Sequence, residues 1–166
     1  MSAQPQNRTL FVGIGSPHGD DRIGWLVAET LRSRVPSEVD VRQAATPSGL
    51  LDWLDGVDRL IVCDACVSCP NAILGELPLH RWQWPTSEVA VLRSAGSHAI
   101  GLPLVLKLAE QLGTLPREVI VFGVEGSCFD AFAELSAELA TACHRIVQTI
   151  ADACRGCSNR EAAHHA

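Results

Sequence analysis

The chain has 166 residues, of which 47% are hydrophobic and 19% are charged. This balance supports a single folded domain with an ordinary buried core and excludes a largely disordered chain. The formal net charge of −6 makes nucleic acid and anionic membrane surfaces unfavourable partners. No signal-like segment opens the sequence, and the first apolar run, 9–14, is too short to span a membrane. We therefore expect a cytoplasmic protein with one domain over 1–166, its core over about 8–154 and a flexible tail over 155–166.

The first half of the chain alternates between strand patterns and helix patterns. Short apolar runs predict three strands, over 9–15, 39–41 and 59–64. Between the first two, the spacing of apolar residues predicts a helix that ends before Pro36, and Asp20 or Asp21 can serve as its N-cap. A shorter helix is expected over 46–55. The third strand is apolar on both faces, which is typical of a central position in a parallel sheet.

The second half continues this alternation. A weak strand pattern covers 73–79, and Trp82 follows it in a stretch that we expect to be irregular. A helix over 100–112, ended by Gly113, is predicted from leucines at helical spacing, namely Leu104, Leu108 and Leu112. A strand over 118–124 follows, and then a long closing helix marked by Phe132, Leu135, Leu139, Cys143, Ile146 and Ile150. This order predicts a three-layer α/β sandwich with a mostly parallel sheet.

Seven cysteines raise the question of a disulfide framework or a zinc site. They include two overlapping C-x-x-C steps, at Cys63, Cys66 and Cys69, and a further pair at Cys154 and Cys157. The number is odd and we expect a reducing compartment, so we interpret them as thiols, some of which pack as small hydrophobic residues. A structural zinc site normally brings two such pairs together, and Cys63 lies inside a strand pattern, so zinc is not favoured.

Polar residues stand where the predicted strands end, which is where active sites of α/β proteins gather. Asp21 leaves the first strand, Asp64 ends the third, and His98 precedes the third helix. An aspartate directly after four apolar residues must be paired or belong to a site, because an unpaired buried carboxylate is costly. If the first and third strands are neighbours, Asp21, Asp64 and His98 form an open set of three ligands that suits nickel or zinc.

Each of these residues also has a structural interpretation. Asp20 or Asp21 can be no more than a helix cap, and His98 can be a satisfied loop histidine. His18 is an alternative ligand from the first loop. Two further histidines have no such placement and are interpreted as structural or exposed, namely His80 and His144. Dinucleotide, phosphate-loop, serine-hydrolase and H-E-x-x-H motifs are missing, which disfavours those enzyme classes.

Three blocks of the sequence occur in an order and at a spacing typical of one family. The blocks are Gly13-x-Gly15 followed by Gly19-Asp20-Asp21-x-x-Gly24, then Leu60-Ile61-Val62-Cys63-Asp64-Ala65, then Ser97-His98-x-x-Gly101-Leu102. Together they resemble the nickel-iron hydrogenase maturation proteases, and Phe122-Gly123-Val124-Glu125 is similar to that family's last strand and the turn after it. The resemblance covers roughly residues 8 to 150. It implies a five-stranded sheet with one antiparallel strand and helices on both faces.

The resemblance also implies a function. In that family an acidic residue after the first strand, an aspartate after the third and a histidine before the next helix bind the metal, which implies this role for Asp21, Asp64 and His98. Family members are endopeptidases that remove a C-terminal extension from the hydrogenase large-subunit precursor once nickel has been inserted. The implied partner is that precursor. The implied nickel is supplied by the substrate, and we expect no tightly held metal of the protease's own.

Two departures limit what the resemblance carries over. The family's first ligand is usually glutamate, whereas Asp21 is one methylene shorter. Many members have Asp-Gly-Gly-Thr after the second strand, where this chain has Gln43-Ala44-Ala45-Thr46, so the role of that aspartate does not transfer. Two other functions stay open at this point. One is an assembly factor that binds the nickel centre without cleaving, and the other is a thiol-redox protein that uses the cysteine pairs.

Overall fold

The computed structural model describes residues 7–67, 77–91 and 100–156. These residues form a five-stranded sheet in the order β2-β1-β3-β5-β4. The strands are β1 Thr9–Ile14, β2 Val39–Ala44, β3 Arg59–Cys66, β4 Leu79–Gln83 and β5 Glu118–Glu125. All neighbouring pairs are parallel except β4 with β5, which is antiparallel. The predicted mostly parallel sheet with one antiparallel strand is therefore confirmed.

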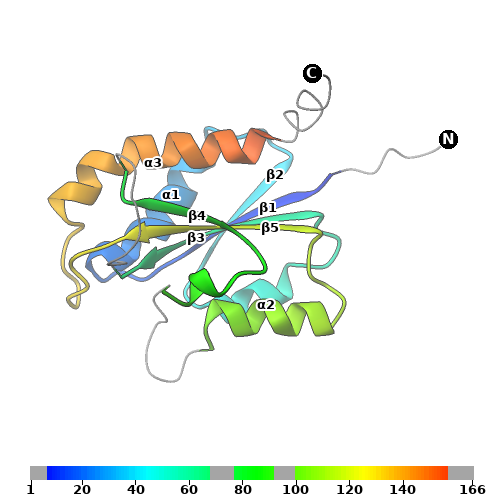
Figure 1. Ribbon diagram of the computed structural model, residues 1–166. Helices are drawn as coiled ribbons and strands as arrows, with labels where there is room; N and C mark the ends of the chain where they lie inside the picture. The colour runs from blue at the N-terminus through cyan, green and yellow to red at the C-terminus, as the bar shows by residue number, and fades with distance from the viewer. Residues whose placement is uncertain (1–6, 68–76, 92–99, 157–166) are drawn as a thin grey trace, which may run out of the picture.

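Helices cover both faces of the sheet, with α1 and α3 on one side and α2 on the other (Figure 1). The α-helices are α1 Ile23–Leu31, α2 Leu102–Gln111 and α3 Ala137–Arg155. Three short 3-10 turns join them, namely η1 Gly19–Arg22, η2 Pro47–Asp52 and η3 Ser87–Val91. The predicted three-layer sandwich is confirmed. In the described part of the chain, no helix is both long and apolar enough to cross a membrane.

The sheet separates two apolar cores, because side chains alternate between its faces along each strand. On β3, Leu60 and Val62 pack into the core under α2, while Ile61 and Cys63 pack into the core under α1 and α3. Every residue of β3 is buried. The prediction that this strand is central and apolar on both faces is confirmed.

Helix α1 and strand β1 are in direct backbone contact. A Cβ atom at Gly24 would lie 2.0 Å from the carbonyl oxygen of Ile14 and 2.9 Å from that of Cys63. A Cβ atom at Gly13 would lie 1.9 Å from the carbonyl oxygen of Gly24. Only glycine permits this approach. The contact holds the start of α1, and the turn η1 before it, against the carboxyl ends of β1 and β3.

The edge strand β4 was misplaced in the sequence analysis. We predicted a strand over 73–79 and an irregular stretch around Trp82, but β4 begins at Leu79 and includes Trp82, which is buried. Residues 73–76 lie outside the described residues. Most residues of β4 are polar or charged, as is common for edge strands, so no apolar run marks it. A similar, smaller difference is that the segment predicted as a helix over 46–55 forms only the 3-10 turn η2.

Helix α3 begins later than predicted. Its N-cap is Ser136, whose Oγ accepts a hydrogen bond of 3.4 Å from the backbone N–H of Leu139. Phe132 and Leu135 therefore lie in the loop before the helix, although their apolar spacing had placed them on it. Phe132 is 76% exposed and has a φ of 54°. This left-handed conformation costs about 1–2 kcal/mol for a residue with a Cβ atom.

Helix α2 lies where the leucine spacing predicted it, and Gly113 follows it with a φ of 74°. Its packed face differs from the predicted one. The buried residues are Leu102, Val105, Leu106 and Ala109, whereas the leucines used for the prediction are exposed, namely Leu104, Leu108 and Leu112. The helix is apolar around much of its circumference, so periodicity alone could not select the buried face.

Candidate functional site

Strands β1 and β3 are neighbours, which was the condition for bringing the predicted site residues together. They pair in parallel, with Gly13 opposite Cys63, so the Asp64 end of β3 lies beside the end of β1. Strand β2 lies on the other side of β1, so the strand order reverses between β1 and β3. At such a switch point, open α/β sheets bind ligands outside the carboxyl ends of the strands.

Asp64 lies at this edge of the sheet and is 1% exposed. Its Oδ1 accepts a hydrogen bond of 2.8 Å from the backbone N–H of Ala65. Alternation along β3 directs the side chain to the same face as Val62, which is the face covered by α2. The strand was predicted to end at Asp64, but β3 continues for two more residues to Cys66, so Asp64 lies within the paired strand rather than at its end. Its burial agrees with the sequence, while its function stays a prediction.

Asp21 lies in η1, directly outside the end of β1, and its residue is partly exposed. Its carbonyl oxygen accepts a hydrogen bond from the N–H of Ser16 (3.1 Å), and its N–H donates to the carbonyl of His18 (3.1 Å). A Cβ atom at Gly15 would lie 2.6 Å from the Asp21 carbonyl oxygen, so the backbone is tightly held. Among the described residues, no hydrogen bond reaches the Asp21 carboxylate, which leaves it available for a ligand.

The neighbouring carboxylate, Asp20, has a different role. It is 0% exposed. Its Oδ2 accepts hydrogen bonds from the backbone N–H groups of Ser127 (2.7 Å) and Cys128 (3.0 Å), and its Oδ1 accepts one from the N–H of Ser136 (2.7 Å). Burial raises the pKa of this carboxyl, but the hydrogen bonds from Ser136, Ser127 and Cys128 outweigh burial and leave the pKa below its ordinary value. Asp20 therefore connects η1 to the start of α3.

The predicted helix cap at Asp20 or Asp21 is wrong. The N-cap positions of η1 and α1 are His18 and Arg22, and neither makes a capping hydrogen bond through its side chain. Asp20 instead binds backbone groups more than 100 residues away in the sequence, a contact for which the sequence has no local signal. Asp20 therefore has a structural role that differs from the predicted cap.

The two candidate histidines have different outcomes. His98 lies outside the described residues, so its predicted place in the site stays a prediction. The Nδ1 atom of His18 accepts a hydrogen bond of 3.0 Å from the backbone N–H of Phe132. The two rings also meet edge to face, with centroids 4.7 Å apart. This contact directs His18 towards the loop before α3 and occupies one of its two nitrogen ligand atoms.

The cysteines of the described residues do not form a reactive or metal-binding cluster. Cys63 and Cys66 form no disulfide, and alternation along β3 directs them to opposite faces of the sheet. Burial, with a smaller effect of Asp64, raises the pKa of Cys63 well above its ordinary value, so the thiol stays protonated. Cys69 and Cys157 lie outside the described residues. Within those residues, no group of three His, Cys, Asp or Glu side chains could hold a metal ion.

One polar pair near the site was missed in the sequence analysis. His80 Nε2 and Glu125 Oε1 lie 3.0 Å apart, and both side chains are largely buried. In the cross-strand register, Gly123 lies between Asp64 on β3 and His80 on β4, so the pair is on the same face as Asp64. His80 had been interpreted as structural or exposed, and its buried hydrogen bond with Glu125 supports a structural role. It could not be placed because the sequence does not reveal β4.

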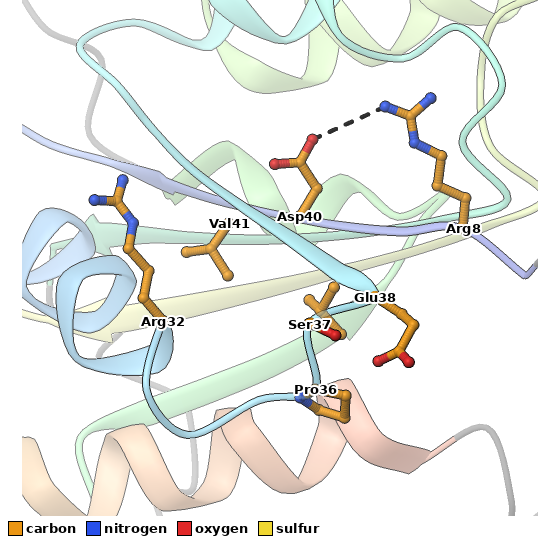
Figure 2. Close-up of a pocket in the computed structure, with 8 residues that line it drawn as sticks. Arg8, Arg32, Pro36, Ser37, Glu38, Asp40 and Val41 are labelled. Atoms are coloured by element: carbon orange, nitrogen blue, oxygen red, sulfur yellow. Dashed lines mark ion pairs between the residues drawn. The ribbon is translucent and has the colours of Figure 1, made fainter.

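Two surface hollows lie elsewhere in the described residues. The first has a volume of about 440 Å³ and lies at the start of β2, where Arg8, Arg32 and Asp40 line it (Figure 2). The second, of about 480 Å³, lies between the segment after β4 and α2. Neither contains Asp21 or Asp64. The first is at the amino end of the sheet, away from the switch point.

The sequence profile of the family HycI, described as hydrogenase maturation protease, matches residues 26–153. No curated protein matches the chain at the level of sequence.

Solved structures share the fold over most of the chain. The hydrogenase maturating endopeptidase HybD from E. coli has a TM-score of 0.71 at 25% identity, over 89% of this chain and 92% of that one. An endopeptidase from E. coli, solved in solution, has a TM-score of 0.72 at 23% identity over the same shares. The [NiFe] hydrogenase maturation protease HycI from Thermococcus kodakarensis has a TM-score of 0.63 at 22% identity, over 90% and 93% of the two chains. The resemblance stated from the sequence is therefore confirmed, and the chain belongs to the hydrogenase maturation protease family, whose members are endopeptidases that act in hydrogenase maturation.

Proposed function

We propose that this protein removes the C-terminal extension of a hydrogenase large-subunit precursor after nickel has been inserted. In this proposal Asp21, Asp64 and His98 bind the nickel that the substrate carries, and no metal stays bound between turnovers. The observation that supports it most is the position of two carboxylates at the switch point, with Asp64 buried two residues before the end of β3 and Asp21 held outside the end of β1.

The chemistry of the donor set fits a substrate-borne cation. Two carboxylates and an imidazole provide oxygen and nitrogen ligands and leave coordination positions open for groups of the substrate. The choice of Asp21 over Asp20 is supported by their surroundings, because three backbone N–H groups already occupy the oxygens of Asp20. His98 is included from its sequence position, four residues before the start of α2.

The proposed reaction is hydrolysis of a peptide bond. A cation beside the carbonyl oxygen of that bond makes the carbonyl carbon more electrophilic. A carboxylate takes a proton from the attacking water, the C–N bond breaks, and the proton passes to the leaving amine. We assign this proton transfer to Asp21, because the residue is partly exposed and its carboxylate accepts no hydrogen bond from the described residues, whereas Asp64 is buried.

The test is a comparison of two forms of one substrate. Purified protein is mixed with nickel-loaded precursor and, separately, with nickel-free precursor, and the products are weighed by mass spectrometry. We expect only the loaded precursor to lose its C-terminal extension. His98→Ala should abolish cleavage, whereas Asp21→Glu should retain it, because the longer acid keeps both the charge and the ligand atoms.

Each alternative predicts a different result in the same experiment. Equal cleavage of both precursor forms would show a protease that does not depend on nickel. Nickel-dependent binding without cleavage would identify a non-cleaving assembly factor, which is the main alternative function.

A further inference from the structure

Phe132 combines two unfavourable features at one surface position. Its φ of 54° lies in the left-handed region, which favours glycine, and its side chain is 76% exposed. The fold gains little from this ring, because most of it is in contact with solvent. An exposed aromatic residue in a backbone conformation that favours glycine indicates a role outside the folded core.

The loop that carries Phe132 is hydrogen-bonded to the turn that carries Asp21. The N–H of Phe132 donates to His18 Nδ1 at 3.0 Å, and the N–H of Gly19 donates to the carbonyl of Ala133, also at 3.0 Å. The Phe132 ring meets the His18 ring edge to face, with an interplanar angle of 75°. Phe132 is therefore fixed against η1 by its backbone, while its ring stays exposed.

The buried Asp20 carboxylate holds both ends of the same loop. It binds the N–H groups of Ser127 and Cys128 before Phe132 and that of Ser136 after it, at 2.7 to 3.0 Å. The N–H of Asp20 donates to the carbonyl of Cys128 at 2.6 Å. These hydrogen bonds fix both ends of the loop to η1 and so restrict how far Phe132 can move relative to Asp21.

The distance from Phe132 to the proposed site is short. The Cα atoms of His18 and Asp21 are three residues apart and can be separated by at most about 11 Å. The Phe132 ring lies a further 4.7 Å from the His18 ring, and an extended peptide advances about 3.3 Å per residue, so about five or six residues span the whole distance. A substrate segment bound at Asp21 can thus reach the Phe132 ring within about six residues of the bond to be cut.

We propose that Phe132 is a docking residue for the substrate polypeptide and contacts an apolar side chain close to the cleaved bond. This rests on the function proposed above and adds a determinant of substrate recognition to it. A rigid, exposed aromatic ring offers a large contact area at a low cost in side-chain entropy, which is why such residues dominate binding surfaces. The partner is apolar because the exposed part of Phe132 is a hydrocarbon ring.

The experiment separates the effect of the Phe132 ring on binding from the effect of the backbone strain on stability. In Phe132→Gly the turn keeps its conformation without strain, so the thermal unfolding midpoint should stay the same or rise. The KM for nickel-loaded precursor should rise about tenfold with kcat unchanged, as for loss of a binding hot spot. Phe132→Leu should restore most of the affinity, because it returns an apolar side chain. Leu112→Ala, which removes another exposed apolar side chain (63% exposed) on the far end of α2, should change neither constant.

The outcomes separate this proposal from the proposed function. The affinity of each variant for the precursor is also measured without cleavage, by surface plasmon resonance. If the wild type binds the precursor but does not cut it, the proposed cleavage fails, while a tenfold loss of affinity in Phe132→Gly still supports docking. An unchanged KM and affinity in Phe132→Gly, or a lower unfolding midpoint, would overturn the docking role. A change only in self-association, seen by size-exclusion chromatography, would assign the ring to a contact between copies of this chain.

Discussion

The carboxylates at the two ends of the sheet have different partners. At the amino end, carboxylates pair with arginines in contact with solvent, as in Asp40 with Arg8 (3.9 Å) and Asp58 with Arg117 (3.4 Å). At the carboxyl end, the carboxylate of Asp20 is buried and held by backbone N–H groups. An arginine neutralises a carboxylate, whereas backbone N–H groups stabilise the charge and leave it in place. Asp20 therefore keeps its negative charge beside η1 at the carboxyl end, whereas arginines neutralise Asp40 and Asp58 at the amino end.

The largest effect is expected for the close contact between α1 and β1. It tests whether the stability of the protein depends on this contact at the carboxyl end of the sheet. Gly24→Ala places a Cβ atom 2.0 Å from the carbonyl oxygen of Ile14, where only backbone movement can relieve the clash. We expect the free energy of unfolding to fall by at least about 3 kcal/mol in urea denaturation. The control is Gly49→Ala, whose nearest neighbour would be 3.6 Å away, and which should change stability little. Equal stability of both variants would show that this contact is not needed.

The second prediction concerns Asp64 and separates activity from stability. Asp64→Asn keeps the shape of the side chain and removes the charge, so cleavage of nickel-loaded precursor should fall at least about 100-fold. The unfolding midpoint should change much less, because the apolar environment of β3 does not depend on that charge. A loss of stability as large as the loss of activity would make Asp64 a structural residue and would remove it from the proposed site.

The third prediction concerns Asp20 and its pH dependence. In Asp20→Asn the amide nitrogen cannot accept hydrogen bonds, so at least one of the N–H groups of Ser127, Cys128 and Ser136 loses its partner. We expect a loss of about 2–3 kcal/mol at pH 7. Because the pKa of Asp20 is lower in the folded state, its contribution is present above the unfolded pKa, near 3.9, and is lost as the pH falls through the lower folded value.

Urea denaturation at pH 7, 4 and 3 would check this sign. The difference in stability between wild type and Asp20→Asn should shrink as the pH falls below about 4. A difference that stays constant with pH would show that the ionised carboxylate is not what holds the loop.

The smallest effect is expected at the amino end. Asp40→Asn removes a partner of Arg8 and Arg42, but these side chains are partly exposed, and pairs of this kind contribute less than about 1 kcal/mol. We expect an unchanged cleavage rate and a small loss of stability that disappears at high salt. A clear drop in cleavage would mean that the hollow beside β2 takes part in substrate binding, and the contrast between the two ends would no longer hold.

Local patterns in the sequence were sufficient for most of the fold. Continuous apolar runs in β1, β3 and β5 identify buried strands because burial on both faces leaves no room for polar residues. The order of these runs with helical segments predicts a parallel sheet, which places Asp21 and Asp64 at one edge. Glycines such as Gly24 were recognised as part of a family motif, and the backbone contact that requires them is visible only in three dimensions.

The remaining features depend on contacts between residues far apart in the chain. The edge strand β4 has no apolar run, so only its pairing with β5 reveals it, together with the pair of His80 and Glu125. Asp20 and Asp21 are adjacent and chemically identical, yet Asp20 binds the start of α3 and Asp21 does not. Phe132 fits the apolar period of α3 and lies outside the helix because Ser136 caps it. Sequence periodicity is a local property, whereas burial, hydrogen-bond partners and exposed faces depend on which distant segments meet.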